Sequence, residues 1–483
     1  VTNMFNKLKP IWLVAKRELR DQLRDWRVLM PMAILTLCFP FLMNEFAKQT
    51  IEFLNQFEAN LILDRLVPFS ILIIGFFPIT VSLVVALESF VGEKERGTIE
   101  PLLSAPFDDW QLYFGKLLVG VITPLAASYI SIGLFLIMVS NQNLTMPSAS
   151  VLIQLFLLTT AHAFLMVSAA IVISVQSTSV KAANLLASFI VIPVAILMQG
   201  EAVMLFWGNE RVLWLGIAGV MIIALLLIRV GIAHFQREYL LGREIDTINL
   251  RWMLKTFLQN FTGEAKSLFD WYTRVVSVAL RRISPAILLI LLIAGVSIWS
   301  SYAWIKDNVA DMIAMATPED IAELEKSMQE VGELPDLSEI QEHLSAPFLF
   351  LNNTRAVAFI FLAGMVSFGV LGIMLYMLNI ALIGGLYGLF ELLGVNPLPI
   401  FLAGVAPHGI FEIPALMIGS AVVLYFGAVI VTPQAGKSMG EVILELFADW
   451  AKIFIGLVVP LLAIAALIEA YISPRLLLSV MGS

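Results

Sequence analysis

The chain has 483 residues, of which 59% are hydrophobic and 14% are charged. A soluble domain carries roughly 25% charged residues, and a mean hydropathy of +0.90 excludes that class. The net charge of −8 comes from separate acidic and basic blocks, so no continuous basic tract offers a nucleic-acid surface. Cys38 is the one cysteine, which excludes a disulfide within this sequence and a cysteine-based zinc cluster. We therefore predict an all-α, polytopic integral membrane protein.

The first part of the chain begins with a basic amphipathic pattern. From residue 11 to 26, apolar residues recur at three- and four-residue spacing with lysines and arginines between them, which predicts a helix on the bilayer surface. No small-residue cleavage site follows, so we expect no removable signal peptide. A second surface helix is predicted over 44–66, and a half-entering loop over 199–210. Six spans are expected, each near the length that crosses about 30 Å of hydrocarbon: 28–43, 67–90, 117–139, 151–175, 182–198 and 212–230.

The side on which basic residues gather predicts the orientation of these spans. Lys94, Arg96, Lys116 and Lys181 fall on the same side as the basic N-terminal segment, whereas residues 141–150 on the other side carry no charge. By the positive-inside rule, both ends of this half are cytoplasmic. Glu88 and His162 fall at the end of one span and inside another. Each is either a hydrogen-bonded interior residue or a group that contacts substrate.

A charged stretch from Gly92 to Pro106 separates the second and third spans. Thr98 can cap a short helix, Pro106 ends it, and Asp108 with Gln111 forms the pattern of a capping box that begins the next helix. We predict a helix, a break and a second helix at the membrane surface. Its carboxylates should face water, and Ile99, Leu102 and Leu103 should be available to a partner.

The sequence motif of this stretch resembles the coupling segment of type-2 ATP-binding cassette (ABC) permeases. The matching positions, which Gly115-Lys116 follows, are Glu93, Glu95, Gly97, Thr98, Glu100, Leu102, Leu103 and Pro106. The alternative is an ordinary loop with a mixed-charge helix. The resemblance implies that residues 1–236 form a permease domain and that this coupling helix inserts into a separate ATPase subunit, which holds ATP and Mg. It also implies a second permease chain, in a homodimer.

Two polar segments divide the rest of the chain. Residues 237–284 interleave basic and aromatic residues and read as a cytoplasmic amphipathic linker. After a span over 286–304, residues 306–346 are strongly acidic, which places them outside the cytoplasm. This acidic segment is either a short helical cap or a solvated loop.

The last part of the chain is apolar and rich in glycine. Five spans are expected here, about eleven in all, with one boundary near residues 376–379. Gly384 and Gly388 form a small-xxx-small pair that allows close helix packing in lipid. His408 and Glu412 are four residues apart and share one helix face. Three interpretations remain open for this pair. It is a structural polar contact, it handles substrate or protons, or it acts in catalysis. As metal ligands they make half a site, so we expect no metal.

This region resembles the stage II sporulation protein M family over residues 285–483. The resemblance rests on Asn352 and Asn353, the glycine-rich helices, and the string Pro407-His408-Gly409-x-x-Glu412. It implies a membrane domain but no common biochemical activity.

Three functions compete for the whole chain. The coupling segment favours a permease subunit that exports a lipid, glycan or peptide with energy from a separate ATPase. The acidic segment and second domain fit a membrane scaffold in an envelope-remodelling complex, whose partners would be envelope proteins. An intramembrane enzyme would use His408 and Glu412. No Gly-x-x-x-x-Gly-Lys-Ser/Thr string is present, so we expect ATP to be bound by a separate ATPase and not by this chain. For the leading function we expect no catalytic residue and no bound cofactor in this chain. Of the three functions, we favour export. We expect the protein to lie in the cytoplasmic membrane of a prokaryote, in contact with membrane lipids.

Overall fold

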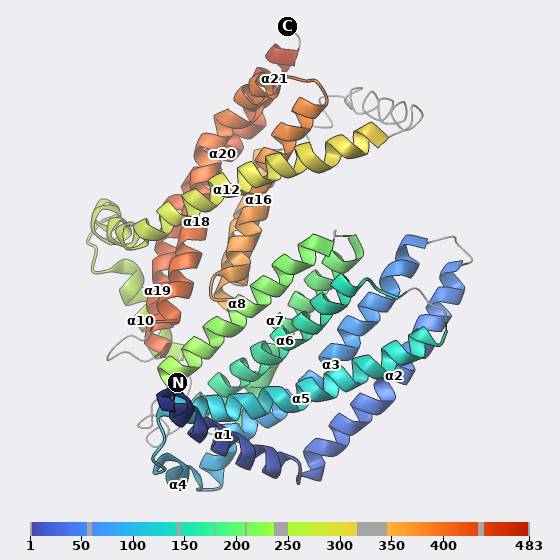
Figure 1. Ribbon diagram of the computed structural model, residues 1–483. Coiled ribbons are helices and arrows are strands. Elements are labelled where there is room, and N and C mark those ends of the chain that lie inside the picture. Colours follow the sequence, from blue (N-terminus) through green and yellow to red (C-terminus); the bar gives the residue numbers. More distant parts are fainter. Residues whose placement is uncertain are drawn as a thin grey trace. The chain divides into compact units, whose positions relative to one another are not determined.

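The computed structural model divides into two compact units, residues 1–248 with 431–433 and residues 249–430 with 434–483 (Figure 1). The residues that the structure describes are 2–55, 60–142, 146–177, 179–207, 210–235, 250–315, 345–432 and 439–481. These residues form helices joined by short turns and contain no strand. The all-α, polytopic class predicted from composition is confirmed. Most of the predicted acidic segment, and the junction at 236–249, lie outside the described residues.

The first unit is a bundle in which one long helix contacts most of the others. Its elements are α1 (Thr2–Gln22), α2 (Trp26–Asn55), α3 (Asn60–Glu95), α4 (Ile99–Leu103), α5 (Asp109–Ser140), α6 (Ala149–Gln176), α7 (Val180–Trp207) and α8 (Glu210–His234). Helix α3 packs against α2, α5, α6 and α7, while α1 packs along α5. Two hydroxyls support this packing, because Ser128 donates to the Gly75 carbonyl (2.7 Å) and Ser131 to that of Thr36 (3.0 Å).

Two predicted elements of the first unit are wrong. Residues 44–55 continue α2 and do not form a separate surface helix. Residues 199–207 continue α7, so no half-entering loop follows the fifth predicted span. Both stretches carry polar residues that periodicity assigned to water, yet Asn44 is 1% exposed and Glu201 is 3% exposed. Their side chains are buried inside the bundle, which a polarity pattern alone does not reveal.

The second unit holds a bundle of long helices with short helical elements at its ends. The elements are α10 (Leu250–Thr262), α11 (Leu268–Asp270), η1 (Trp271–Val276), α12 (Ser277–Met315), α15 (Ala346–Val366), α16 (Val370–Leu392), α17 (Pro397–Ile400), η2 (Phe401–Val405), α18 (Ala406–Ile430), α19 (Met439–Ile453), η3 (Phe454–Val458), α20 (Val459–Tyr471) and α21 (Ser473–Met481). The three η elements are π-helical turns. Helices α12, α15, α16, α18 and α20 pack on one another, and α10 lies against α19.

The turn between α15 and α16 corrects a predicted boundary. The helix break lies at Ser367–Gly369, not near residues 376–379. Phe368 has φ 53° and Gly369 has φ 94°, a backbone region that ends a helix and that glycine enters without steric cost. Tyr376 is instead fully buried within α16. The chain near residue 379 is therefore the interior of a helix and not a loop.

Ten helices of the described residues are long and apolar enough to cross a membrane. Five lie in the first unit and five in the second, against six and five expected. The fifth predicted span, over 182–198, lies within α7, a helix of 28 residues. Several side chains of that stretch lie outside the described part of the chain, so the count does not test this span.

Close packing of α12 on α16 depends on the predicted small-residue pair. A β-carbon on Gly384 would overlap the backbone carbonyl of Ile298, and one on Gly388 would lie 3.2 Å from the Tyr302 ring. Between them, the Ser301 hydroxyl donates to the Ala381 carbonyl at 2.6 Å. Helices in lipid associate through such contacts because lipid gives no hydrophobic drive between them. The role predicted for Gly384 and Gly388 is confirmed.

We predict that Gly384→Ala destabilises the second unit by about 1–3 kcal/mol, the usual cost of inserting a methyl group into a packed contact. Gly295→Ala on α12 is the matched control, because nothing lies within 4 Å of its β-carbon. It should be neutral or stabilising by about 0.5–1 kcal/mol. Thermal unfolding of the purified chain in detergent measures both. Equal midpoints for the two variants would contradict the packing argument.

Candidate functional site

The charged stretch of the first unit has the predicted helix, break and second helix, since α4 ends at Leu103 and α5 begins at Asp109. Before α4, helix α3 ends at Glu95 and the chain reverses at Gly97 with φ 69°. The hydroxyl of Thr98 donates to the Glu93 carboxylate at 2.6 Å and so ties the start of α4 back to α3. The capping box is also present, since the backbone N–H of Asp108 donates to the Gln111 side chain at 2.9 Å. Residues 92–106 are called the coupling segment below.

A buried ammonium group anchors the coupling segment to two other helices. The Lys116 side chain is 1% exposed and lies in α5. Its Nζ is 2.9 Å from Glu18 Oε1 of α1 and 3.6 Å from Glu93 Oε1 of α3, and it donates to the Ser89 carbonyl at 2.7 Å. One cation therefore joins α1, α3 and α5 at the start of the coupling segment.

Helix α1 approaches this cation closely because the preceding residue is glycine. A β-carbon on Gly115 would lie 2.7 Å from the Val14 side chain, which is too close for any other residue. The Gly115-Lys116 pair thus has two structural roles, a close helix contact and an ion pair with the same helix. Between α1 and the coupling segment is a cavity of about 330 Å³, lined by Leu13, Val14, Arg17, Glu18, Thr98, Pro101, Ala105 and Phe107.

A second set of contacts ties the end of α3 to the junction of α6 and α7. The Lys94 Nζ donates to the carbonyls of Val175 (2.7 Å) and Ser177 (3.2 Å). The Glu95 carboxylate accepts from the backbone N–H of Val180 at 2.8 Å, at the first residue of α7. A carboxylate at a helix N-terminus is favourable because it satisfies free N–H groups and opposes the helix dipole. The coupling segment is therefore attached directly to α5, α6 and α7, and to α1 through Lys116.

These contacts divide the predicted coupling residues into two groups. Glu93 pairs with Lys116 of α5 inside the unit, its side chain 16% exposed, and Ile99 is 6% exposed. The prediction that Ile99 is available to a partner is therefore wrong. The prediction that carboxylates face water holds for Glu95 and Glu100 but not for Glu93, whose partner on α5 local sequence does not reveal. The exposed residues are Glu95, Arg96, Gly97, Thr98, Glu100, Pro101, Ser104 and Pro106. The side chains of Leu102 and Leu103 lie outside the described part.

A buried polar pair in the first unit includes a residue that sequence reasoning missed. His162 Nε2 of α6 lies 3.4 Å from Glu201 Oε1 of α7, and both side chains are 3% exposed. His162 Nδ1 faces the Leu158 carbonyl at 3.1 Å, and the Phe76 ring meets the imidazole edge to face. The pair can share one proton inside the bundle. Only the contact between α6 and α7 identifies Glu201, because 39 residues separate it from His162.

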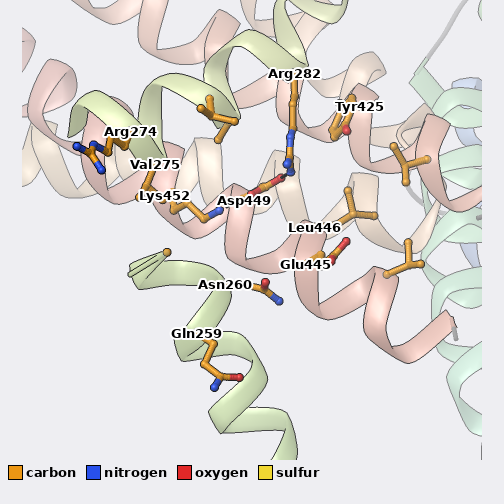
Figure 2. Close-up of a pocket in the computed structure, with 15 residues that line it drawn as sticks. Gln259, Asn260, Arg274, Val275, Arg282, Tyr425, Glu445, Leu446, Asp449 and Lys452 are labelled. Atoms are coloured by element: carbon orange, nitrogen blue, oxygen red, sulfur yellow. Dashed lines mark hydrogen bonds and ion pairs between the residues drawn. The ribbon is translucent and has the colours of Figure 1, made fainter. Parts of the chain in front are cut away.

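The second unit has a pocket of about 460 Å³ where α10 and α19 meet α12 and α18 (Figure 2). Figure 2 shows Asp449 between Arg282 and Lys452, with which it forms contacts of 3.2 Å and 2.5 Å. Arg274 pairs with Asp270 at 2.8 Å. Each of these three cations thus has a carboxylate partner of its own unit. We therefore interpret these charges as structural contacts between helices.

The predicted His408 and Glu412 pair belongs to a larger cluster. His408 Nε2 lies 3.9 Å from Glu412 Oε2 on α18, and Glu469 of α20 brings a third potential ligand atom. These three ligand atoms lie within 4.8 Å of one another. Ser473, the first residue of α21, places its Oγ 3.0 Å from His408 Nδ1. Glu469 and Ser473 were missed because they are about 60 residues away in sequence, although their own spacing of four places them on one face.

The other predicted residues of this region do not join the cluster. Gly409 is buried in α18 beside His408. Asn352 is exposed and Asn353 half-buried in the second turn of α15. In the described part of the chain, no hydrogen bond or ion pair joins either asparagine to His408 or Glu412. Of these five positions, His408 and Glu412 contribute ligand atoms to the cluster.

Comparison with known protein families finds one matching family in each of the two units. Residues 12–210 match the model of the ABC-2 family transporter proteins, and residues 286–474 match that of stage II sporulation protein M. The chain joins members of these two families. The recognition made from the coupling segment and the second motif is confirmed, because one region of the chain matches each family model. It is also similar to an uncharacterized protein of Methanocaldococcus jannaschii, with 31% identity over 133 residues, covering 27% of this chain and 71% of that protein.

We predict that Lys116→Met destabilises the ABC-2 domain strongly, by about 3–5 kcal/mol, because removing one partner leaves buried carboxylates without a cation. Lys48→Met is the control, since the Lys48–Glu45 pair is exposed and such pairs contribute about 0–1 kcal/mol. Thermal unfolding in detergent, with limited proteolysis near residue 22, measures the change. Wild-type stability of the Lys116 variant would refute the anchoring role.

Proposed function

We propose that this chain is the permease of an ABC exporter, and that a separate ATPase subunit binds the exposed face of its coupling segment. The observation that carries the proposal is the division of that segment into an inner and an outer set of residues. Glu93, Lys94 and Lys116 hold it to the helices of the ABC-2 domain, while Arg96 and Glu100 are exposed to solvent. A docking element needs both properties.

The inner contacts give this element a mechanical role. A force on α4 passes through the Thr98–Glu93 hydrogen bond to α3, and through Lys116 to α1 and α5. The Glu95–Val180 bond passes it to α7. Closure of the ATPase would thus move several spanning helices together. ATP and Mg would be bound by the partner, since this sequence has no phosphate-binding loop of the Gly-x-x-x-x-Gly-Lys-Ser/Thr type.

The direction and cargo belong to the same proposal. The apolar bundle and the resemblance to export permeases support movement of a lipid, glycan or peptide out of the cytoplasm. Two permease chains would form the route as a homodimer in the cytoplasmic membrane. Basic residues at the coupling segment support a cytoplasmic location for that segment and for the N-terminus.

We expect Glu100→Lys to weaken ATPase binding several-fold, because it reverses an exposed charge on the docking face without removing an internal contact. The chain is purified gently from native membranes, and the co-purifying ATPase per chain is measured by quantitative mass spectrometry.

Glu45→Lys provides the matched control. It reverses an exposed carboxylate of α2 whose Lys48 partner is also exposed, so the amount of ATPase should stay at the wild-type level. If no nucleotide-binding subunit co-purifies with the wild type under several gentle conditions, the proposal fails. An unchanged ATPase ratio in the Glu100 variant would instead place the docking face elsewhere.

A further inference from the structure

The cluster of His408, Glu412 and Glu469 in the second unit has the chemistry of a metal site. It offers one imidazole nitrogen and two carboxylate oxygens, and these atoms lie within 4.8 Å of one another. Three ligands held by two different helices form a preorganised half-shell. Three protein ligands with remaining open positions are typical of sites that keep exchangeable water or substrate.

Ser473 gives the histidine the orientation that a metal ligand needs. His408 Nδ1 lies 3.0 Å from the Ser473 Oγ, and an Nδ1–H that donates to this oxygen leaves the Nε2 lone pair free. Nε2 is the nitrogen that faces Glu412, at 3.9 Å. Histidines that bind metals almost always donate their other ring N–H in this way, which fixes the tautomer and the ring plane.

The charges of the cluster are not balanced within the protein. No lysine or arginine among the described residues forms an ion pair with Glu412 or Glu469, and the Glu469 Oε2 atom is buried without a hydrogen bond to any of them. The side chains of His408 and Glu412 are only 14% and 30% exposed. Two carboxylates at such a place repel each other and are costly to desolvate. A divalent cation would neutralise the two carboxylates and bind the Glu469 Oε2 atom.

The backbone around the cluster is shaped to bring its members together. The π-helical turn η2 ends at Val405, directly before the helix that carries His408. Such turns shift the register of the following residues and occur often at functional sites. Helix α21 packs on η2, where the Leu477 side chain lies 3.4 Å from the β-position of Gly404. This contact holds Ser473 next to His408.

We propose that His408, Glu412 and Glu469 bind one divalent transition-metal ion, with Ser473 as the residue that positions His408. The mixed ligand set decides the class of metal. Carboxylates alone suit Mg²⁺ and Ca²⁺, whereas an imidazole with carboxylates suits Zn²⁺, Fe²⁺ or Mn²⁺. The inference does not depend on the exporter proposal, because it concerns the stage II sporulation protein M domain alone.

Metal binding is tested on the full chain in detergent, stripped with a chelator, incubated with Zn²⁺ or Mn²⁺ and desalted. Inductively coupled plasma mass spectrometry should find about one metal ion per wild-type chain, and Co²⁺ should give a visible absorption band. We expect Glu469→Gln and His408→Gln to lose stoichiometric binding, and Ser473→Ala to weaken it by about 10–100-fold. Added metal should raise the unfolding midpoint of the wild type but not of the first two variants.

Glu391→Gln is the matched control. Glu391 is a glutamate of the same unit that accepts hydrogen bonds from Tyr302 (2.7 Å) and Lys306 (2.9 Å) and does not belong to the cluster. It should bind metal as the wild type does. The proposal is overturned if the wild type retains no more metal than Glu469→Gln while both show the same unfolding midpoint, or if Glu391→Gln loses binding equally. In either case the cluster would be a polar contact whose carboxylates are neutralised by protons.

Discussion

The buried ammonium of Lys116 is the interaction on which the ABC-2 domain depends most directly. A charge taken out of water costs several kcal/mol unless partners replace its hydration, and here Glu18, Glu93 and the Ser89 carbonyl replace it. These partners come from α1 and α3, so neither helix can leave its position at α5 without exposing an unpaired charge. Helix α1 and the start of the coupling segment are thereby held together as parts of one element.

The same energetic rule explains which parts of the site could be predicted from the sequence. Features whose partners are local were predicted, such as the Asp108–Gln111 capping box and the end of the short helix before Pro106. Small residues at a spacing of four predicted the α12–α16 contact, because the backbone approach needs no particular partner side chain. Periodicity also placed most spans, since lipid imposes a length and a composition on each.

Residues whose partners come from distant helices were not predicted. Glu201 reads as a solvated residue in sequence, yet His162 lies 3.4 Å away across a helix contact. Glu469 likewise stands in an apolar stretch and gains meaning only beside His408. Ile99 had the character of a docking residue, but the unit itself covers it. In each case the role of the residue depends on which helices pack together, and a single sequence does not reveal that packing.

The free energies of the outer and inner contacts decide how the coupling segment would respond when a partner pulls on it. An exposed charge such as Glu100 contributes about 0–1 kcal/mol to a contact with a partner, whereas separating Lys116 from its buried carboxylates costs about 3–5 kcal/mol. The bonds of Lys94 and Glu95 to the α6–α7 junction add to the inner set. A partner that pulls on the outer face would therefore detach before the segment separates from its helices. Since the inner attachment is the stronger one, the segment moves with the bundle as one piece, which is the condition for transmitting an ATPase movement into the membrane.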